Sequence, residues 1–205
     1  TYIDSKDARI PNDRNDLRQA RDIATARVSF YEGYMAYEEG LGRGDKEPDL
    51  TRFPEAIQML SDFEGQHGKS ASELVSLAHY VVGRSHIETG KLDLAEERYR
   101  TLKSSAPGDS NIAVLASAIF GAYDDLVTAK SKEVDGIAKD GTDKEVEQVN
   151  EELNGLRRQA VAIGTDYFEN ASEPQYGICY QVLQLMEALR DWRRIEAFGN
   201  KTLQT

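Results

Sequence analysis

The sequence predicts an all-α fold built from antiparallel helix pairs. Apolar residues recur at spacings of three and four along most of the chain, and no segment alternates apolar and polar residues over the length of a strand. Five prolines and a set of glycine-containing breaks divide these periodic stretches into segments of helix length. We therefore expect an extended segment at 1–14 and then one helical domain over 15–205. Its four helix pairs are expected at 15–68, 70–106, 109–170 and 174–205.

The first pair is expected to open with a helix over 15–39. Its apolar positions form one stripe that should face a partner, namely Leu17, Ala20, Ala24, Val28, Tyr31 and Met35. Glycines end this helix. A shorter helix then begins near Thr51 or Phe53, carries Pro54 in its first turn, where no N–H is needed, and ends at Gly68.

The second pair is expected at 70–89 and 92–104, with Gly90 as the turn between its helices. The fourth pair is expected at 175–189 and 192–203, separated by the dipeptide at 190–191. The last helix would then present an uncovered apolar end with Phe198 and Leu203.

The third pair is longer than the others and predicts an extended helical hairpin. A helix over 110–139 is followed by Asp-Gly-Thr-Asp at 140–143, which combines a C-terminal glycine with an N-cap. The returning helix has a heptad seam formed by Val146, Val149, Leu153, Leu156, Ala160, Ile163 and Tyr167. The seam is expected to pack on the preceding helix, and dimerisation through it is the alternative.

Composition narrows the classes of partner. The 205 residues include 36 acidic and 25 basic side chains, for a net charge of -11. This charge argues against binding to nucleic acid, and it would repel an anionic membrane surface. No apolar run approaches the roughly 18 residues of a membrane span, so we expect no direct membrane insertion. We expect a soluble chain, and either the cytoplasm or a bacterial periplasm suits it.

One segment has the spacing of a known helical repeat. Gly83, Gly90, Ala95, Tyr99 and Pro107 follow one another at intervals of seven, five, four and eight residues. This pattern resembles the tetratricopeptide (TPR) repeat and is clearest over 76–109. The sequence departs from the family pattern at two positions, 86 and 102, where His and Leu replace the usual aromatic residue and Ala.

The other helix pairs match the repeat less closely. Gly33, Ala36 and Gly40 reproduce the spacing of the first helix of a repeat, helix A, and a helix A begins in phase at Ser110. Asp-Trp at 191–192 is similar to the start of the second helix, helix B. The resemblance implies a right-handed α-solenoid of about four repeats, with two insertions.

No catalytic, cofactor-binding or metal-binding motif is present in the sequence. Adjacent carboxylates point in different directions around a helix, and no phosphate-binding loop, zinc motif or nucleophile motif occurs. The single cysteine, Cys179, and the histidines His79 and His86 are expected to serve packing. We predict that the chain is not an enzyme and that it needs no cofactor or metal.

The resemblance also implies a binding surface. In TPR proteins, helix A of each repeat lines the concave surface and contacts bound peptides. The corresponding aromatic, basic and amide side chains, which we predict to bind a partner, are Arg27, Phe30, Tyr34, Tyr37, Tyr80, Arg84 and Asn111. Packing of the tyrosines against neighbouring helices is the alternative. The lysine and asparagine set of the carboxylate clamp is absent, so a hydrophobic or mixed peptide, or a helix, fits better than an acidic C-terminus.

We therefore expect a non-catalytic protein-interaction scaffold that binds a peptide or helix in a concave TPR groove. The alternative is a self-assembling structural protein that forms a homo-oligomer through the long hairpin or the C-terminal helix. A third hypothesis is a regulatory domain of an enzyme.

Overall fold

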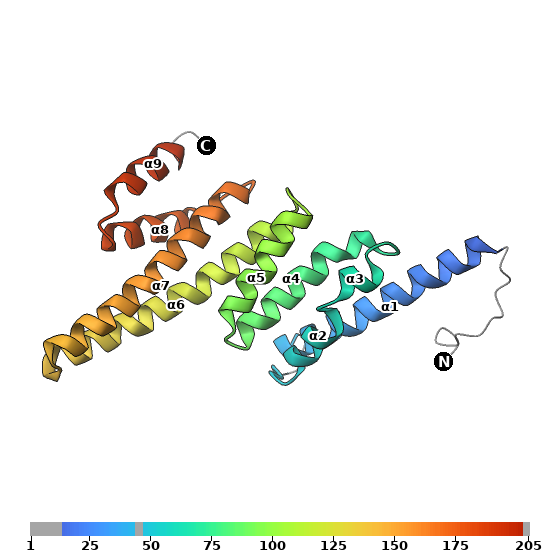
Figure 1. The fold of residues 1–205 in the computed structure, drawn as a ribbon, viewed down its shortest axis with the longest axis horizontal. Helices are drawn as coiled ribbons and strands as arrows, with labels where there is room; N and C mark the ends of the chain where they lie inside the picture. The colour runs from blue at the N-terminus through green and yellow to red at the C-terminus, as the bar shows by residue number, and fades with distance from the viewer. Residues whose placement is uncertain (1–13, 44–46, 203–205) are drawn as a thin grey trace. The chain divides into compact units, whose positions relative to one another are not determined.

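A computed structural model describes residues 14–43 and 47–202, and every regular element in these ranges is an α-helix (Figure 1). This confirms the all-α prediction. The segment expected to be extended, 1–14, lies outside the described residues except for Arg14. The chain divides into two compact units, Thr1–Pro107 and Gly108–Thr205. The expectation of a single domain over 15–205 stays a prediction.

The described part of unit 1 contains five helices: α1 (Asn15–Leu41), α2 (Arg52–Leu60), α3 (Phe63–His67), α4 (Ser72–Glu88) and α5 (Leu92–Ser105). α1 packs against α2, α3 and α4. α2 and α3 also pack against α4, and α4 packs against α5. Contacts in unit 1 therefore join helices that are close in sequence.

Two glycines of α1 allow α2 to approach it closely. A Cβ atom on Gly33 would lie 2.5 Å from Leu60 Cγ, and one on Gly40 would lie 2.7 Å from Phe53 Cε1. Both distances are well below van der Waals contact, so a larger residue at either position would push the helices apart. Leu60 and Phe53 are themselves buried. The small residues at 33 and 40 therefore set the spacing between α1 and α2.

α1 has two apolar stripes, and the one that packs into unit 1 is not the predicted one. The buried side of the helix consists of Ala26, Phe30, Gly33, Ala36, Tyr37 and Gly40. The predicted stripe is largely exposed, with exposed fractions of 42% for Leu17, 44% for Val28, 56% for Tyr31 and 56% for Met35. In Figure 1 the N-terminal end of α1 runs past the other helices of unit 1. The predicted stripe therefore has no partner within the described residues of unit 1.

The helix expected between residue 51 and Gly68 is divided into α2 and α3 at Ser61 and Asp62. The Ser61 hydroxyl donates to the carbonyl of Ile57 at 2.6 Å, and Asp62 leaves the helical conformation with φ -110° and ψ 20°. Both residue types favour helix ends, because their side chains compete for backbone hydrogen bonds. After the break, Phe63 is buried with its ring 5.7 Å from that of Phe30.

A part-buried polar network ties α3, α4 and α5 together. Arg98 Nη1 lies 3.1 Å from His79 Nδ1, and a guanidinium can only donate. His79 Nδ1 is therefore the acceptor, and Nε2–H donates to Glu64 Oε2 at 3.0 Å. Burial lowers the pKa of His79, more than the Glu64 carboxylate raises it. His79 is thus neutral and has one defined tautomer.

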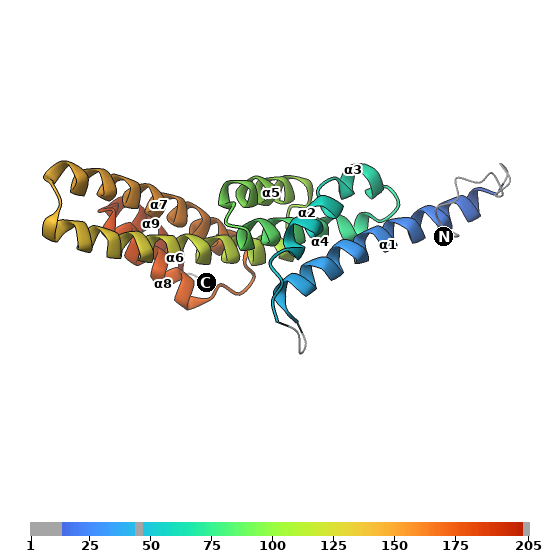
Figure 2. The same ribbon diagram turned by 90° about the horizontal axis from the view of Figure 1, so that it is seen from below.

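The described part of unit 2 contains four helices: α6 (Ser110–Asp140), α7 (Asp143–Asn170), α8 (Tyr176–Ala188) and α9 (Trp192–Thr202). α6 and α7 pack along each other as the long hairpin, α7 packs against α8, and α8 packs against α9 (Figure 2). The heptad seam is used inside this unit, since Val149, Leu153, Ala160, Ile163 and Tyr167 are all buried.

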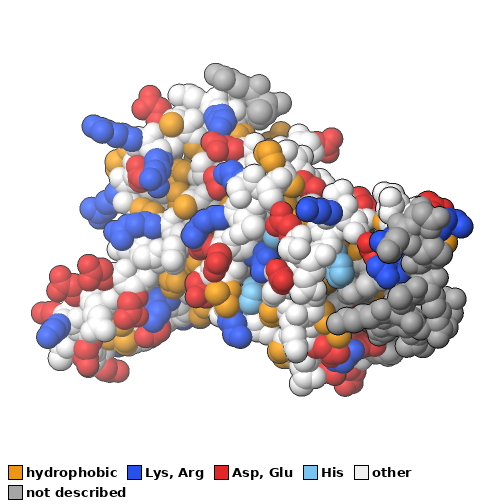
Figure 3. All heavy atoms as spheres, turned by 45° about the vertical axis from the view of Figure 1, so that its right-hand side comes forward, with side chains coloured by type: hydrophobic (Ala, Val, Ile, Leu, Met, Phe, Trp, Pro, Cys, Tyr) orange, Lys and Arg blue, Asp and Glu red, His pale blue; other side chains and the backbone are white. Residues whose placement is uncertain are grey.

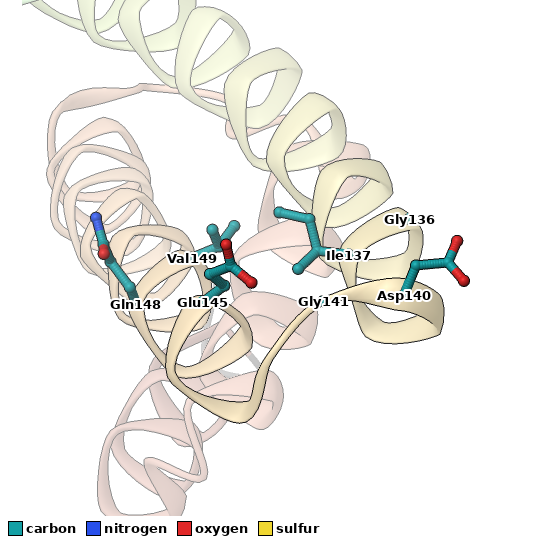
Figure 4. A pocket seen from close by; sticks show the side chains of 7 residues that line it. All are labelled: Gly136, Ile137, Asp140, Gly141, Glu145, Gln148 and Val149. Atoms are coloured by element: carbon teal, nitrogen blue, oxygen red, sulfur yellow. The ribbon is translucent and has the colours of Figure 1, made fainter.

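The tip of the hairpin is closed by a capping box. The Thr142 hydroxyl accepts a hydrogen bond from the Glu145 N–H at 3.4 Å, and Glu145 Oε2 accepts one from the Thr142 N–H at 2.8 Å. Figure 4 shows Ile137 of α6 and Val149 of α7 pointing toward each other beside this turn. The reversal of the chain at 141–142 is therefore specified by polar caps, with two apolar side chains facing each other beside it.

The C-terminal helix is less exposed than expected. Phe198 is 5% exposed and lies 5.1 Å from the ring of Phe168 on α7, so it does not form an uncovered apolar end. Leu203, the other residue of that prediction, lies outside the described residues.

By length and composition alone, α6 could cross a membrane. Its apolar composition also serves packing, because Ile112, Leu115, Ile119 and Phe120 are buried within unit 2.

Candidate functional site: the α1–α4 face

Six of the predicted binding residues lie on or just beneath one face of unit 1. We define the α1–α4 face by Arg27, Tyr34 and Glu38 of α1 and by Tyr80 and Arg84 of α4. Four of the predicted residues occupy binding positions of helix A in two successive TPR-like pairs. They are Arg27 and Tyr34 in the first pair and Tyr80 and Arg84 in the second. The packing of α1 on α4 brings the two sets together.

Two predicted residues support this face from below. Phe30 is 1% exposed and Tyr37 is 3% exposed, so neither side chain presents a contact surface. The Phe30 ring stacks on Tyr34 at a centroid distance of 5.9 Å, and Tyr37 lies 6.3 Å from Tyr34. Both residues therefore position Tyr34. The alternative interpretation, in which the aromatic residues pack inside the protein, holds for Phe30 and Tyr37. Tyr34 and Tyr80 are half-buried.

The tyrosine hydroxyls lie among charged groups. Burial raises the pKa of Tyr37 to about 12, with Tyr80 adding to the effect and Arg84 opposing it. Burial and the neighbouring Glu38 carboxylate raise the pKa of Tyr34. Both phenols are therefore protonated at neutral pH and can donate hydrogen bonds.

Ion pairs frame the face. Arg27 Nη2 donates to Glu73 Oε1 at 3.3 Å and so joins α1 to α4, although both side chains are more than half exposed. Arg84 Nη2 donates to Glu88 Oε1 at 3.0 Å along α4. Solvent-exposed pairs contribute little to stability, because water and salt screen them and the long side chains lose entropy. They therefore arrange charge on the face more than they stabilise the fold.

Two polar atoms of the face are buried and lack a hydrogen-bond partner among the described residues. They are Nε of Arg84, a donor, and Oε1 of Glu38, an acceptor. Glu38 is held by Arg43, whose Nη1 lies 3.2 Å from Oε2. A buried polar atom without a partner costs about 1–3 kcal/mol, so small side-chain movements that satisfy these atoms would be favourable.

Asn111, the remaining predicted residue, belongs to unit 2. It lies in the first turn of α6, where its backbone N–H donates to Asp109 Oδ1 at 2.8 Å, and its side chain is partly buried. Asn111 is therefore not one of the residues that define the α1–α4 face.

Two carboxylates were not among the predicted binding residues, namely Glu38 of this face and Glu73, which pairs with Arg27 at its edge. The second was missed for a structural reason. It lies in the first turn of α4, and its pKa is lowered by a backbone hydrogen bond and by Arg27. Only the packing of α1 on α4 brings these two charges together, since 46 positions separate them in the sequence.

Other polar features of the described residues serve structure. No group of three or more His, Cys, Asp or Glu side chains in this part of the chain could hold a metal ion. Cys179 is buried, and burial raises the pKa of its thiol, which disfavours the reactive thiolate. A hollow of about 550 Å3 at the hairpin tip includes Glu145 (Figure 4). That carboxylate accepts a hydrogen bond from the Thr142 N–H.

Charge is unevenly distributed over the surface. Figure 3 shows acidic side chains gathered at the tip of the α6–α7 hairpin and several basic side chains gathered above it in the same view.

Comparison with protein families, with curated proteins and with solved structures gives no match for this chain in any of the three.

Proposed function

We propose that this chain is a non-catalytic protein-interaction scaffold of TPR-like helix pairs, arranged as a right-handed α-solenoid, which binds a peptide or a helix through its α1–α4 face. The observation that supports this most directly is the pairing of half-buried Tyr34 and Tyr80 on adjacent helices, flanked by Arg27 and Arg84. Tyrosine and arginine are among the side chains most enriched at interface hot spots.

The packing order in unit 1 supports the repeat proposal. In a solenoid of helix pairs, each first helix packs on its own second helix and on the first helix of the next pair. α1 packs on α2 and α3 and also on α4, which would begin the second pair. Gly33 lies where α1 meets α2, as expected for two helices that cross closely.

The ligand that suits this face is a hydrophobic or mixed-charge segment. Its aromatic rings offer apolar area and phenolic donors, and cations and carboxylates alternate around them. A purely acidic peptide would meet Glu38, Glu73 and Glu88 as well as the arginines, and it would also be repelled by the net charge of -11.

A peptide library displayed on phage, selected against the whole chain, provides the test. Selected peptides should bind the wild type and lose at least about tenfold in affinity on Tyr34→Ala or Tyr80→Ala. The matched control is Tyr176→Ala, because Tyr176 is 90% exposed on α8 of unit 2. Selected peptides that bind both tyrosine variants as tightly as the wild type would contradict the proposal, provided that circular dichroism shows the helices intact.

Self-assembly through the hairpin seam or the C-terminal helix is not favoured by the described contacts. Leu153 is 2% exposed and Phe198 is 5% exposed, so these apolar side chains are already covered within unit 2.

A further inference from the structure

The first part of α1 is a helix that the other described residues of unit 1 do not bury. α1 has 27 residues, yet the first of them to be buried is Ala26. Most of the stability of a helix in a protein comes from the packing of an amphipathic face. A contact along the side of residues 15–25 that the described residues of unit 1 leave uncovered would therefore stabilise this part of α1.

The uncovered side has the spacing of a two-helix seam. Leu17, Arg21, Ala24, Val28, Tyr31 and Met35 follow one another at alternating intervals of four and three. This is the heptad period of helices that pack along each other. The large apolar members of the seam are 42–56% exposed, and single soluble domains seldom leave such a row of apolar side chains in water.

We propose that this seam, which we call the α1 seam, pairs with the α1 seam of a second copy of the chain in antiparallel orientation. The register that sets Leu17 against Met35 of the second copy also sets Arg21 against Tyr31 and Ala24 against Val28. Every apolar position then faces an apolar or aromatic one, and the Arg21 guanidinium lies over a tyrosine ring. A two-fold axis relates the copies, so the contact closes as a dimer.

The charges beside the seam favour this orientation and this occupant. Arg14, Arg18 and Arg21 outnumber Asp16 and Asp22 toward the N-terminal end of α1, although Asp16 pairs with Arg14 and Asp22 pairs with Arg21. The residues toward its C-terminal end include Glu32, Glu38 and Glu39. In the antiparallel register, Arg18 flanks Glu32 of the second copy, and the two-fold axis repeats this pair. A parallel pairing in register would set Arg21 against Arg21. The excess of cations toward one end of α1 and of carboxylates toward the other therefore favours the pairing in which one copy is reversed.

The first test is sedimentation equilibrium of the whole chain over a range of concentrations. The wild type should dimerise. Val28→Asp combined with Met35→Asp should yield a monomer that keeps the helical circular dichroism of the two units. Val114→Asp is the matched control, because Val114 is 49% exposed on α6 and should leave the dimer intact. A wild type that is monomeric at every concentration, or a dimer that survives the double substitution, would overturn the proposal.

A charge exchange tests the orientation without altering the apolar seam. Arg18→Glu and Glu32→Arg should each raise the dimer dissociation constant about tenfold, because each turns two attractive pairs into repulsive ones. An equimolar mixture of the two variants should recover wild-type affinity. In the mixed dimer the introduced glutamate meets the introduced arginine in one pair, and the other pair keeps the native Arg18 and Glu32. A mixture that stays as weak as its components would exclude the antiparallel register.

The inference does not depend on the proposed function, because none of the exchanged residues belongs to the α1–α4 face. A wild type that dimerises but whose selected peptides do not need Tyr34 and Tyr80 would refute only the proposed function. A monomeric wild type whose selected peptides need both tyrosines would refute only the pairing of the α1 seam.

Discussion

Gly90 and Arg190 occupy the same position of the same turn, one between α4 and α5 and the other between α8 and α9. Their φ angles are 71° and 57°, both left-handed. The N–H of each donates to the carbonyl three residues earlier, at 2.9 and 2.8 Å. The N–H of the next residue donates to the carbonyl five residues earlier, at 2.8 and 3.0 Å. Two helix pairs with different residues at this position thus share one turn geometry, and the end of α1 has it as well at Gly42, whose φ angle is 68°.

Replacement of the arginine at this turn should stabilise the protein. A side chain in the left-handed conformation costs about 1 kcal/mol, whereas glycine adopts it freely. Arg190→Gly should therefore raise the free energy of unfolding by about 0.5–1 kcal/mol in urea titration. Gly90→Arg is the reciprocal control and should lower it by a similar amount. Equal stability of both variants and the wild type would mean that the turn is relaxed.

Gly164 should not tolerate a methyl group, although it lies inside a helix. A Cβ atom there would lie 2.3 Å from Val182 Cγ2 and 2.9 Å from Phe120 Cδ2, and both side chains are buried. Gly164→Ala should therefore lower the free energy of unfolding by about 1–3 kcal/mol. Gly155→Ala, in the same helix with open space around it, should instead raise it by about 0.5–1 kcal/mol. Thermal unfolding of the two variants side by side would show opposite shifts.

Acid should destabilise unit 1 through His79. An unfolded histidine titrates near pH 6.5, and burial lowers the pKa of His79 in the fold. The folded state then binds fewer protons, so the stability contribution is complete above about pH 6.5 and is lost as the pH falls through the folded pKa. Protonation at Nδ1 would also break the hydrogen bond from Arg98, while Glu64 on α3 faces the other ring nitrogen.

The measurement is the free energy of unfolding in urea at pH 7 and at pH 5. The wild type should lose stability between the two, and His79→Gln should reduce that loss while lowering stability at pH 7. His86, whose pKa is also lowered by burial, accounts for part of the remainder. An undiminished loss in the glutamine variant would show that His79 is not the group responsible.

The hairpin tip should depend on the Thr142 hydroxyl. Thr142→Ala removes the acceptor for the Glu145 N–H and half of the capping box. Loss of an N-cap side chain costs about 1 kcal/mol. Hydrogen exchange should accelerate in the first turns of α7 and at the end of α6, while Thr142→Ser should behave as the wild type. Exchange that is unchanged at the tip would show that the cap is not needed to hold this turn.

Helix positions could be predicted from the sequence because periodicity and caps are local properties. The boundaries at Gly90 and Thr142 are marked by residue types that suit the ends of helices. The break between α2 and α3 was missed, because the apolar spacing continues through it and only Ser61 and Asp62 mark it.

The orientation of α1 could not be predicted in the same way. Both of its stripes have helical spacing, and large apolar side chains occur on the exposed one as well as on the buried one. Gly33 and Gly40 determine which stripe is buried, because only that side allows Leu60 and Phe53 to approach. For the same reason, Phe30 and Tyr37 lie beneath the α1–α4 face and not on it.

The α6–α7 hairpin also bears on how unit 2 acquires its fold. Its two long helices are joined at 141–142, so the contacts nearest the tip close only short loops. Short loops cost little entropy, and proteins rich in such contacts fold in microseconds to milliseconds. The two helices can pair progressively from the Thr142 turn toward Tyr167. Each contact that forms brings the next pair of side chains close together. Because α8 packs on α7, we expect α8 and α9 to dock after the hairpin has formed.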